Sequence, residues 1–296
     1  MKNISLIILI ISLISSCTPI ENVALSVDAL ENAQQVGDVM ASLDEASGQT
    51  NGSIASHSNS INKMYARYFP ASKGEIIFNQ LNPSVEAASC SLLSFTTCAS
   101  GEKVRNYNGC TIGSTTLSGT TTLSWSNNTC TLTAISDTVT RVPNFTLTGR
   151  RSATLTVNKT GSYGQKLTAS SVNAPNSIFL FESDGIRRKF TAGSSTLFDQ
   201  TTSVSPGITV TGNNRLSRTL SGGVVRVYNN LTGVTCTYSP TNITWGLSTC
   251  NCPTSGYWSG SCSNSKQLTL EITGCGTANY TEGGETSSVT FDRCGT

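Results

Sequence analysis

Most of the chain alternates between apolar and polar residues over short runs. From residue 79 onward, runs rich in Thr, Val, Leu and Ile are separated by Gly, Asn and Pro, a pattern typical of β-strands joined by turns. The clearest runs are Thr120 to Trp125, Cys130 to Ile135, Ala153 to Val157, Ser177 to Glu182, Gly223 to Val227, Gln267 to Ile272 and Ser287 to Phe291. Closely spaced strands with tight turns pair antiparallel, because parallel pairs need long crossovers. The sequence predicts a mainly β, antiparallel domain, and a sandwich, a barrel and an extended meander all fit.

The region before these strands has helical periodicity. Between Val23 and Leu43, apolar residues recur at spacings of three and four, which forms one stripe of an amphipathic helix. The stripe consists of Val23, Val27, Leu30, Ala33, Val36, Met40 and Leu43. Residues 48–60 are rich in Gly, Ser and Asn and predict a linker, and Met64 to Phe69 predict a short helix that ends at Pro70. We expect the stripe to dock on the chain's own β domain; a coiled-coil or partner surface is the alternative.

The first residues form a short and very apolar segment. Lys2 supplies a positive start, residues 4–14 are almost entirely Ile and Leu, and Ile-Ser-Ser-Cys at 14–17 then places small residues before a cysteine. This run is too short for a permanent transmembrane helix. The segment resembles the signal peptide of bacterial lipoproteins, whose lipobox ends at the cysteine that is lipidated.

The resemblance implies a lipid-anchored protein of the cell envelope. Residues 1–16 would be the signal peptide, cleavage would precede Cys17, and acyl chains on Cys17 would hold the mature chain on a membrane without a membrane-spanning segment. Thr18 follows the cysteine where Asp is the usual inner-membrane retention signal, so the resemblance implies the outer membrane in a Gram-negative cell. The alternative is an ordinary secretory signal in which Cys17 is incidental.

The cysteine count also indicates export. Without Cys17 there remain ten, in groups of four and six separated by residues 131–235: Cys90, Cys98, Cys110, Cys130, Cys236, Cys250, Cys252, Cys262, Cys275 and Cys294. An even number in an exported chain predicts up to five disulfide bonds within the two groups. Closure between sequence neighbours would join Cys110 to Cys130 and Cys236 to Cys250.

A zinc site is the competing interpretation of the second group. It would use four thiolates, those of Cys250, Cys252, Cys262 and Cys275. Their spacings do not match the paired CxxC arrangement of zinc knuckles, and exported thiols oxidise. We therefore expect no metal and no cofactor.

Charge and composition divide the chain into a tether and a β region. Charged residues make up 12% of the chain and hydrophobic residues 37%, which is enough for a core of thin layers. Residues 18–78 hold seven acids and three bases, whereas residues 79–296 hold ten acids and fifteen bases. We assign residues 17–78 to a lipid-anchored helical tether and linker, and the rest to the β region.

A weak internal repeat predicts two related β modules. Trp125 stands five residues before Cys130, and Trp245 stands five residues before Cys250. The boundary would fall near 203–207, giving a first module at 79–205 and a cysteine-rich second module at 206–296. We expect both tryptophans to pack as core beside disulfide bonds.

The residues needed for common catalytic sites are scarce. The chain has one histidine, His57, in the predicted linker, and it lacks the signature motifs of serine hydrolases, zinc proteases and phosphate-binding loops. Acids in the β region are scattered singly, so a carboxylate-based hydrolase is a less favoured alternative. The sequence favours a protein that is not an enzyme.

Binding is the remaining kind of function. Tyr257 and Trp258 lie in a predicted turn-rich loop and are candidates for an exposed aromatic platform for sugars. Residues 187–189, Arg-Arg-Lys, form a basic cluster after an expected hairpin turn at Asp184-Gly185. The sequence pI near 8.0 gives no indication of nucleic acid as a partner.

Together these features predict a structural, adhesive or binding component of the envelope. Its expected partners are the membrane, through the lipid anchor, and surface glycans or other envelope proteins. The alternative function is carbohydrate binding through Tyr257 and Trp258. The sequence indicates neither an oligomeric state nor which side of the membrane the domain faces.

Overall fold

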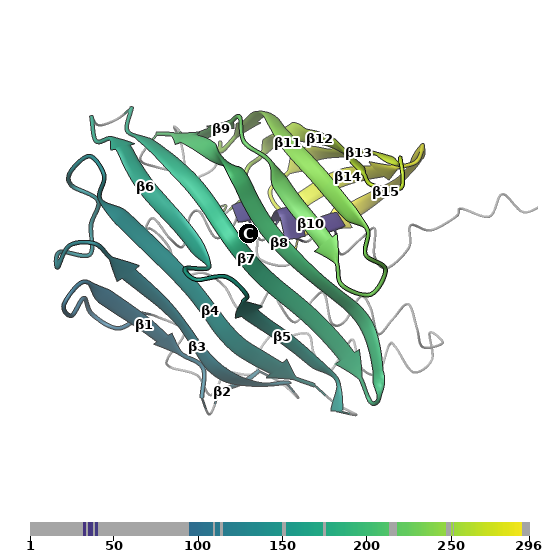
Figure 1. Ribbon diagram of the computed structural model, residues 1–296, viewed down its shortest axis with the longest axis horizontal. Coiled ribbons are helices and arrows are strands. Elements are labelled where there is room, and N and C mark those ends of the chain that lie inside the picture. The colour runs from purple at the N-terminus through teal and green to yellow at the C-terminus, as the bar shows by residue number, and fades with distance from the viewer. Residues whose placement is uncertain are drawn as a thin grey trace, which may run out of the picture.

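The computed structural model describes residues 32–33, 35–37, 39–40 and 95–291, with gaps at 109, 113–114, 150–151, 174–175, 213–217, 247–249 and 251. Within these residues, fifteen strands form one sheet, and every pair of neighbouring strands is antiparallel (Figure 1). The prediction of an antiparallel, mainly β domain is therefore confirmed. Residues 1–31 and 41–94, which include Cys17, the predicted linker, His57 and the predicted helix at 64–69, lie outside the described residues.

The strands follow one another through the sheet almost in sequence order. They are β1 Glu102–Asn106, β2 Cys110–Ile112, β3 Thr115–Trp125, β4 Thr138–Thr148, β5 Thr154–Lys159, β6 Gln165–Ser171, β7 Ile178–Ala192, β8 Ser195–Thr211, β9 Thr219–Ser221, β10 Val225–Asn229, β11 Thr235–Thr244, β12 Ser255–Cys262, β13 Gln267–Gly274, β14 Thr277–Glu282 and β15 Glu285–Thr290. The main path omits only β2, β6 and β9, and β5 and β6 lie end to end between β4 and β7. Of the three predicted architectures, this order is that of the extended meander.

Six of the seven predicted strand runs lie in strands, apart from at most two residues at an end, and the seventh is wrong. Residues 130–135 form turns and bends before β4. The Asp137 carboxylate accepts the backbone N–H groups of Thr133 and Ala134, each at 2.9 Å, and the side-chain amide of Asn127, also at 2.9 Å. These side-chain bonds satisfy backbone groups that a ladder would otherwise use, so a compact loop replaces the expected strand.

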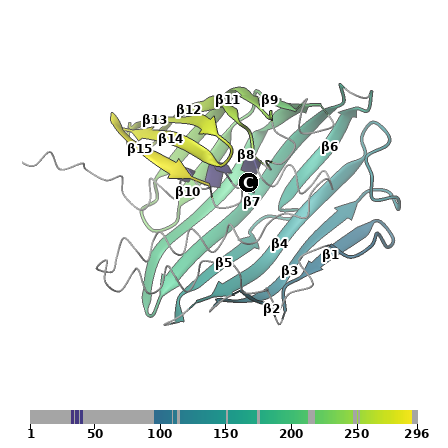
Figure 2. The same ribbon diagram turned by 180° about the vertical axis from the view of Figure 1, so that it is seen from behind.

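The short N-terminal helix lies in the part of the sheet that curves over. Strands β1 to β8 spread out broadly, and β10 to β15 turn back so that the helix lies between β8–β10 and β13–β15 (Figures 1 and 2). Ala33, Val36 and Met40, three members of the predicted stripe, are fully buried in the main apolar cluster. The described part of the stripe therefore docks on the chain's own β domain.

Polar contacts also hold this helix in place. The Gln200 amide in β8 donates to Asn32 Oδ1 at 3.0 Å, and the Trp258 indole N–H in β12 donates to Met40 Sδ at 3.3 Å. Asn32 in turn donates to Cys236 Sγ at 3.6 Å. Residues more than 160 positions away in sequence thus fix the helix, which makes it part of the folded domain.

The concave, covered face of the broad strands carries a band of buried polar side chains between two apolar clusters. One cluster surrounds the helix, and the other includes Phe145, Phe190 and Phe198. The band contains three arginines that are at most 3% exposed: Arg105, Arg141 and Arg188. The Arg141 guanidinium donates to Gln165 Oε1 at 2.8 Å. Buried charges of this kind persist only where other groups compensate them.

The disulfide bonds join partners other than sequence neighbours. The structure contains Cys98–Cys130, Cys236–Cys262 and Cys250–Cys275, so the predicted closures Cys110 to Cys130 and Cys236 to Cys250 are wrong. The register explains one of the observed bonds, because residues 236 and 262 are direct cross-strand partners in β11 and β12. Each of the three pairs stays within its predicted group.

The other described cysteines are also oxidised. Cys110 and Cys252 are disulfide-bonded, whereas Cys90 and Cys294 lie outside the described residues. Because the four cysteines of the alternative zinc site are all in disulfide bonds, the structure contradicts that interpretation.

The predicted module boundary falls inside a strand. β8 runs through Pro206 and Gly207 and pairs with β7 on both sides of them. Trp245 is buried, and Trp125 is half-buried against the main apolar cluster. The chain therefore passes from the first predicted module to the second without a linker, within one sheet.

Candidate functional site

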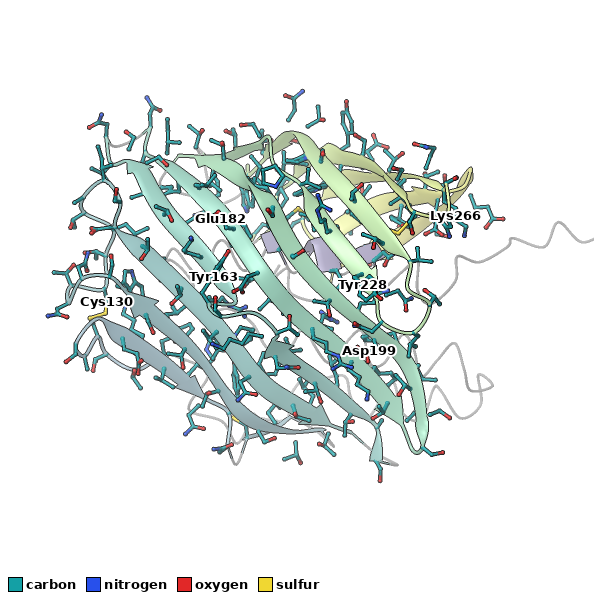
Figure 3. The ribbon with its side chains drawn as sticks, in the orientation of Figure 1. Cys130, Tyr163, Glu182, Asp199, Tyr228 and Lys266 are labelled. Carbon is teal, nitrogen blue, oxygen red and sulfur yellow. A yellow bond between two sulfur atoms is a disulfide. The ribbon has the colours of Figure 1, made fainter. Side chains whose placement is uncertain are left out.

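The outer face of the sheet, opposite the helix, is the candidate binding surface. On each strand, buried residues alternate with more exposed ones, and the exposed set is dominated by threonine on β4, β5 and β11. Examples are Thr140, Thr146, Thr154, Thr156, Thr237 and Thr241. Two groups of side chains on this face combine an aromatic ring with charges, and Figure 3 shows them over β6–β7 and over β8–β10.

The first group, the Tyr228 cluster, consists of Arg187, Asp199, Thr201, Tyr228 and Asn230. Strand register builds it, because Arg187 on β7 lies opposite Thr201 on β8, which lies opposite Tyr228 on β10. Arg187 Nε donates to Asp199 Oδ1 at 2.7 Å, and a second guanidinium nitrogen donates to Oδ2. This bidentate geometry fixes the guanidinium plane.

Asn230 also binds the Asp199 carboxylate. Its amide donates to Asp199 Oδ1 at 2.9 Å and to Thr201 Oγ1 at 3.1 Å, and its backbone N–H donates to the Asp199 carbonyl at 2.8 Å. Asp199 is only 4% exposed, whereas the Arg187 side chain is 39% exposed. The hydrogen bond to Asp199 raises the pKa of Arg187, so the cluster presents a charged and rigid guanidinium.

Two further cations lie next to this cluster. Lys189 is directly opposite Asp199 in the register of β7 and β8. Arg226 precedes Tyr228 by two residues on β10, is exposed on the same face, and donates from Nε to the Ser205 carbonyl at 3.4 Å. Around Tyr228 there are thus three cations and one carboxylate.

The second group, the Tyr163 cluster, consists of Tyr163, Lys166, Glu182 and Asp184. Lys166 Nζ lies 2.9 Å from Glu182 Oε2 and 4.8 Å from the centre of the Tyr163 ring. The Asp184 carboxylate accepts the backbone N–H groups of Tyr163 at 2.9 Å and Gly164 at 2.7 Å. A Cβ at position 161 would lie 2.2 Å from Asp184 Cγ, so glycine is required there for this close approach.

Electrostatics differ between the two clusters. Partial burial raises the pKa of Asp184, but the hydrogen bonds from the 162–164 backbone and from the Ser162 hydroxyl lower it by more, so the carboxylate stays ionised. The Tyr163 cluster contains one cation and two carboxylates, and a second cation lies next to it, because Lys159 Nζ donates to the Ser162 carbonyl at 2.7 Å. Its charges balance, whereas the Tyr228 cluster is basic.

The predicted Tyr257–Trp258 platform is wrong. Ser255–Cys262 is strand β12 and not a loop, so consecutive side chains point to opposite faces. Trp258 is 0% exposed inside the main apolar cluster, and only Tyr257, at 42%, lies on the outer face. A paired aromatic platform does not form here.

The predicted basic hairpin is also wrong. Asp184 and Gly185 lie within β7 at a register shift, and the strand continues to Ala192. Arg188 points to the covered face and is buried, while Arg187 and Lys189 lie on the outer face. The three basic residues therefore contribute to two different faces.

Tyr228, Asp199 and Asn230 were not among the residues predicted from the sequence. A signal was present for Tyr228, because Val-Arg-Val-Tyr at 225–228 alternates and places Arg226 and Tyr228 together on the polar side. No local signal indicates Asp199, since its partners come from β7 and from the turn after β10.

Two described glutamates are engaged by lysine. Glu182, on the outer face, pairs with Lys166. Glu282 lies on the same face of β14 as the buried Tyr280, and it accepts from Lys266 Nζ at 2.7 Å and from the Tyr280 hydroxyl at 2.9 Å. Within the described ranges, no group of three or more His, Cys, Asp or Glu side chains is arranged to hold a metal ion.

Comparisons with known proteins provide no family. No protein-family model matches this chain, and neither a curated protein nor a solved structure matches it. Among the residues that the structure describes, no helix is long and apolar enough to cross a membrane.

Proposed function

We propose that this protein is a non-enzymatic lipoprotein of the cell envelope that presents its broad sheet as a structural, adhesive or binding surface. The observation that carries the proposal is the apolar run at 4–14 followed by Ile-Ser-Ser-Cys at 14–17. Acyl chains on Cys17 would give stable membrane anchoring, since two lipid signals suffice where one is marginal. A Gram-negative cell would carry the protein on its outer membrane.

The oxidation state of the cysteines supports an exported protein. All eight described cysteines are in disulfide bonds, and such bonds persist in oxidising compartments and are rare in reducing ones. The disulfide bonds and the signal segment are independent observations that favour the same location.

Intact mass and free-thiol count on protein extracted from its native membrane test this proposal. We expect a chain that begins at Cys17 and carries the mass of acyl chains, with no reactive thiol. An uncleaved chain, or one cleaved at another position without lipid, would overturn the anchor.

A substitution at the anchor gives a second test. Cys17→Ser should release the protein from the membrane fraction or leave its precursor uncleaved. Cys98→Ser is the matched control, because it removes a sulfur from a described disulfide bond and should leave membrane attachment unchanged. Equal membrane attachment in both variants would contradict lipid anchoring through Cys17.

Carbohydrate binding is the second candidate function. The observation that favours it is Tyr228, which is 44% exposed on the outer face beside an ordered group of Asp, Asn, Arg and Thr side chains. A rigid aromatic ring next to oriented hydrogen-bonding groups is the arrangement that fixes an apolar sugar face and its hydroxyls. A glycan array with the wild-type chain and Tyr228→Ala tests it, and equal signals from both would remove this candidate.

A further inference from the structure

We propose that the Tyr228 cluster binds an acidic saccharide, with a sugar ring on Tyr228 and the carboxylate of that saccharide on Arg187. This inference deepens the second candidate function and rests on the proposed role of the sheet as a binding surface. It does not depend on how the protein is attached to the membrane.

The ring of Tyr228 is accessible because its neighbours are short. Its cross-strand partners are Thr201 on β8 and Thr235 on β11. Both are threonines, which can cover little of an aromatic ring between them, and this agrees with its exposed fraction of 44%. A large apolar surface in this position is available to a ligand that offers an apolar face.

Arg187 supplies oriented donors beside that ring. A guanidinium has five N–H donors, and the bidentate pair with Asp199 uses two of them. The side chain is 39% exposed, so the other donors can meet a ligand. Because Asp199, which is itself held by Asn230, already fixes the guanidinium, binding costs little side-chain entropy.

Charge selects an anion over a neutral sugar at this position. Arg187, Lys189 and Arg226 outnumber the single carboxylate of Asp199, and a bidentate guanidinium matches the geometry of a carboxylate. The Tyr163 cluster has no such excess of positive charge, because Lys166 and the adjacent Lys159 match its two carboxylates. The acidic saccharide should therefore occupy the Tyr228 cluster and not the Tyr163 cluster.

Calorimetric titration of the full mature protein in detergent tests the ligand class. The probes are tetragalacturonate and its methyl ester, which has the same sugar rings without the charges. We expect the acid to bind at least about tenfold more tightly than the ester, and this preference to shrink at high salt. Equal affinities would overturn the acidic class, and tight binding of a glycerol-phosphate oligomer in place of the acid would overturn the saccharide.

Two tyrosine variants locate the site. Tyr228→Ala should weaken binding of the acid by at least about tenfold, whereas Tyr228→Phe should retain most of it. Tyr257→Ala is the matched control, because Tyr257 is a tyrosine of nearly equal exposure, 42%, on the same face at a distant position. Equal losses in the two alanine variants would contradict a site at Tyr228.

Lys189→Gln tests the contribution of charge. We expect a several-fold smaller preference for the acid over the ester and an unchanged melting temperature, because Lys189 is partly exposed. An unchanged preference would overturn the electrostatic argument. If all these binding tests fail but Cys17 is lipidated, the envelope proposal stands and the binding site is wrong. If binding is found but Cys17 is not lipidated, the binding site stands and the lipid anchor is wrong.

Discussion

The curved end of the sheet and its broad part bury polar groups in different ways. In the curved end, the Tyr238 and Tyr280 hydroxyls lie 3.1 Å apart. The Tyr280 hydroxyl donates a hydrogen bond to Glu282, and Glu282 also accepts one from Lys266 at the surface. Burial raises the pKa of both tyrosines, so both remain neutral. In the broad part, the buried polar groups include three arginines, Arg105, Arg141 and Arg188, beside neutral side chains such as those of Gln165 and Gln200.

This difference predicts where each part is vulnerable. The curved end has a continuous apolar core around the helix, so loss of volume should cost most there. The broad part divides its apolar residues into two clusters around buried charges, so loss of a charge should cost most there. Four predictions test this comparison, in order of decreasing effect.

Trp258→Ala should have the largest effect. The side chain is fully buried, and its indole N–H contacts Met40 of the helix, so we expect a loss of about 3–5 kcal/mol in the free energy of unfolding. Tyr257→Ala, one residue away on the outer face, should change it by less than about 0.5 kcal/mol. Denaturant unfolding of the two variants measures the contrast, and similar losses would contradict the opposite placement of these side chains.

The same strand shows what the sequence could have predicted. Residues 258, 260 and 262 alternate with 257, 259 and 261, and the disulfide-bonded Cys262 marks the buried side. The prediction of a turn-rich loop at Tyr257 and Trp258 concealed this alternation. Fold class and most strands follow from local alternation, whereas the faces follow only when a strand and one buried residue in it are both recognised.

Arg188→Met should have the next largest effect. Arg188 is buried on the covered face and has interaction partners there, and removing one member of a buried charged group typically costs about 3–5 kcal/mol. Lys189→Met, the same replacement on the outer face, should cost less than about 1 kcal/mol. If thermal unfolding showed equal shifts in the two variants, the buried arginine band would not distinguish the broad part.

Partners that are distant in sequence explain what could not be predicted. The disulfide between Cys236 and Cys262 depends on the register of β11 against β12, and proximity in sequence favoured Cys250 instead. The Tyr228 cluster likewise needs the positions of β7, β8 and β10 together. The described part of the helix stripe could be predicted because periodicity is local, whereas these contacts could not, because register is not local.

Gly37→Ala tests how closely the helix packs in the curved end. A Cβ at this position would lie 2.5 Å from Phe291 Cδ1, so overpacking of about 1–3 kcal/mol should exceed the gain in helix propensity of about 1 kcal/mol. We expect a modest net loss of stability in denaturant unfolding.

A second substitution separates the cost of overpacking from the gain in helix propensity. Phe291→Leu removes the ring that the new methyl group meets, so Gly37→Ala should become neutral or stabilising in that background. Additive effects of the two substitutions would show that the helix and Phe291 do not touch.

Asp184 provides the smallest effect, confined to the outer face of the broad part. Its folded-state pKa is lowered, because hydrogen bonds from the turn at 162–164 outweigh the effect of burial. A lowered folded pKa means that this carboxylate stabilises the fold above the unfolded pKa near 3.9, and that the stabilisation disappears as pH falls through the folded pKa. Amide exchange at Tyr163 and Gly164 should therefore accelerate at acid pH, relative to global unfolding. Asp184→Asn should produce faster exchange already at neutral pH, because a neutral amide accepts these bonds more weakly.

Amides beside the Tyr238–Tyr280 pair should show no such local acceleration, since both hydroxyls are neutral throughout this range. Equal acceleration in the two places would mean that acid loosens the whole sheet at once, and that its two parts do not differ in how they hold charge.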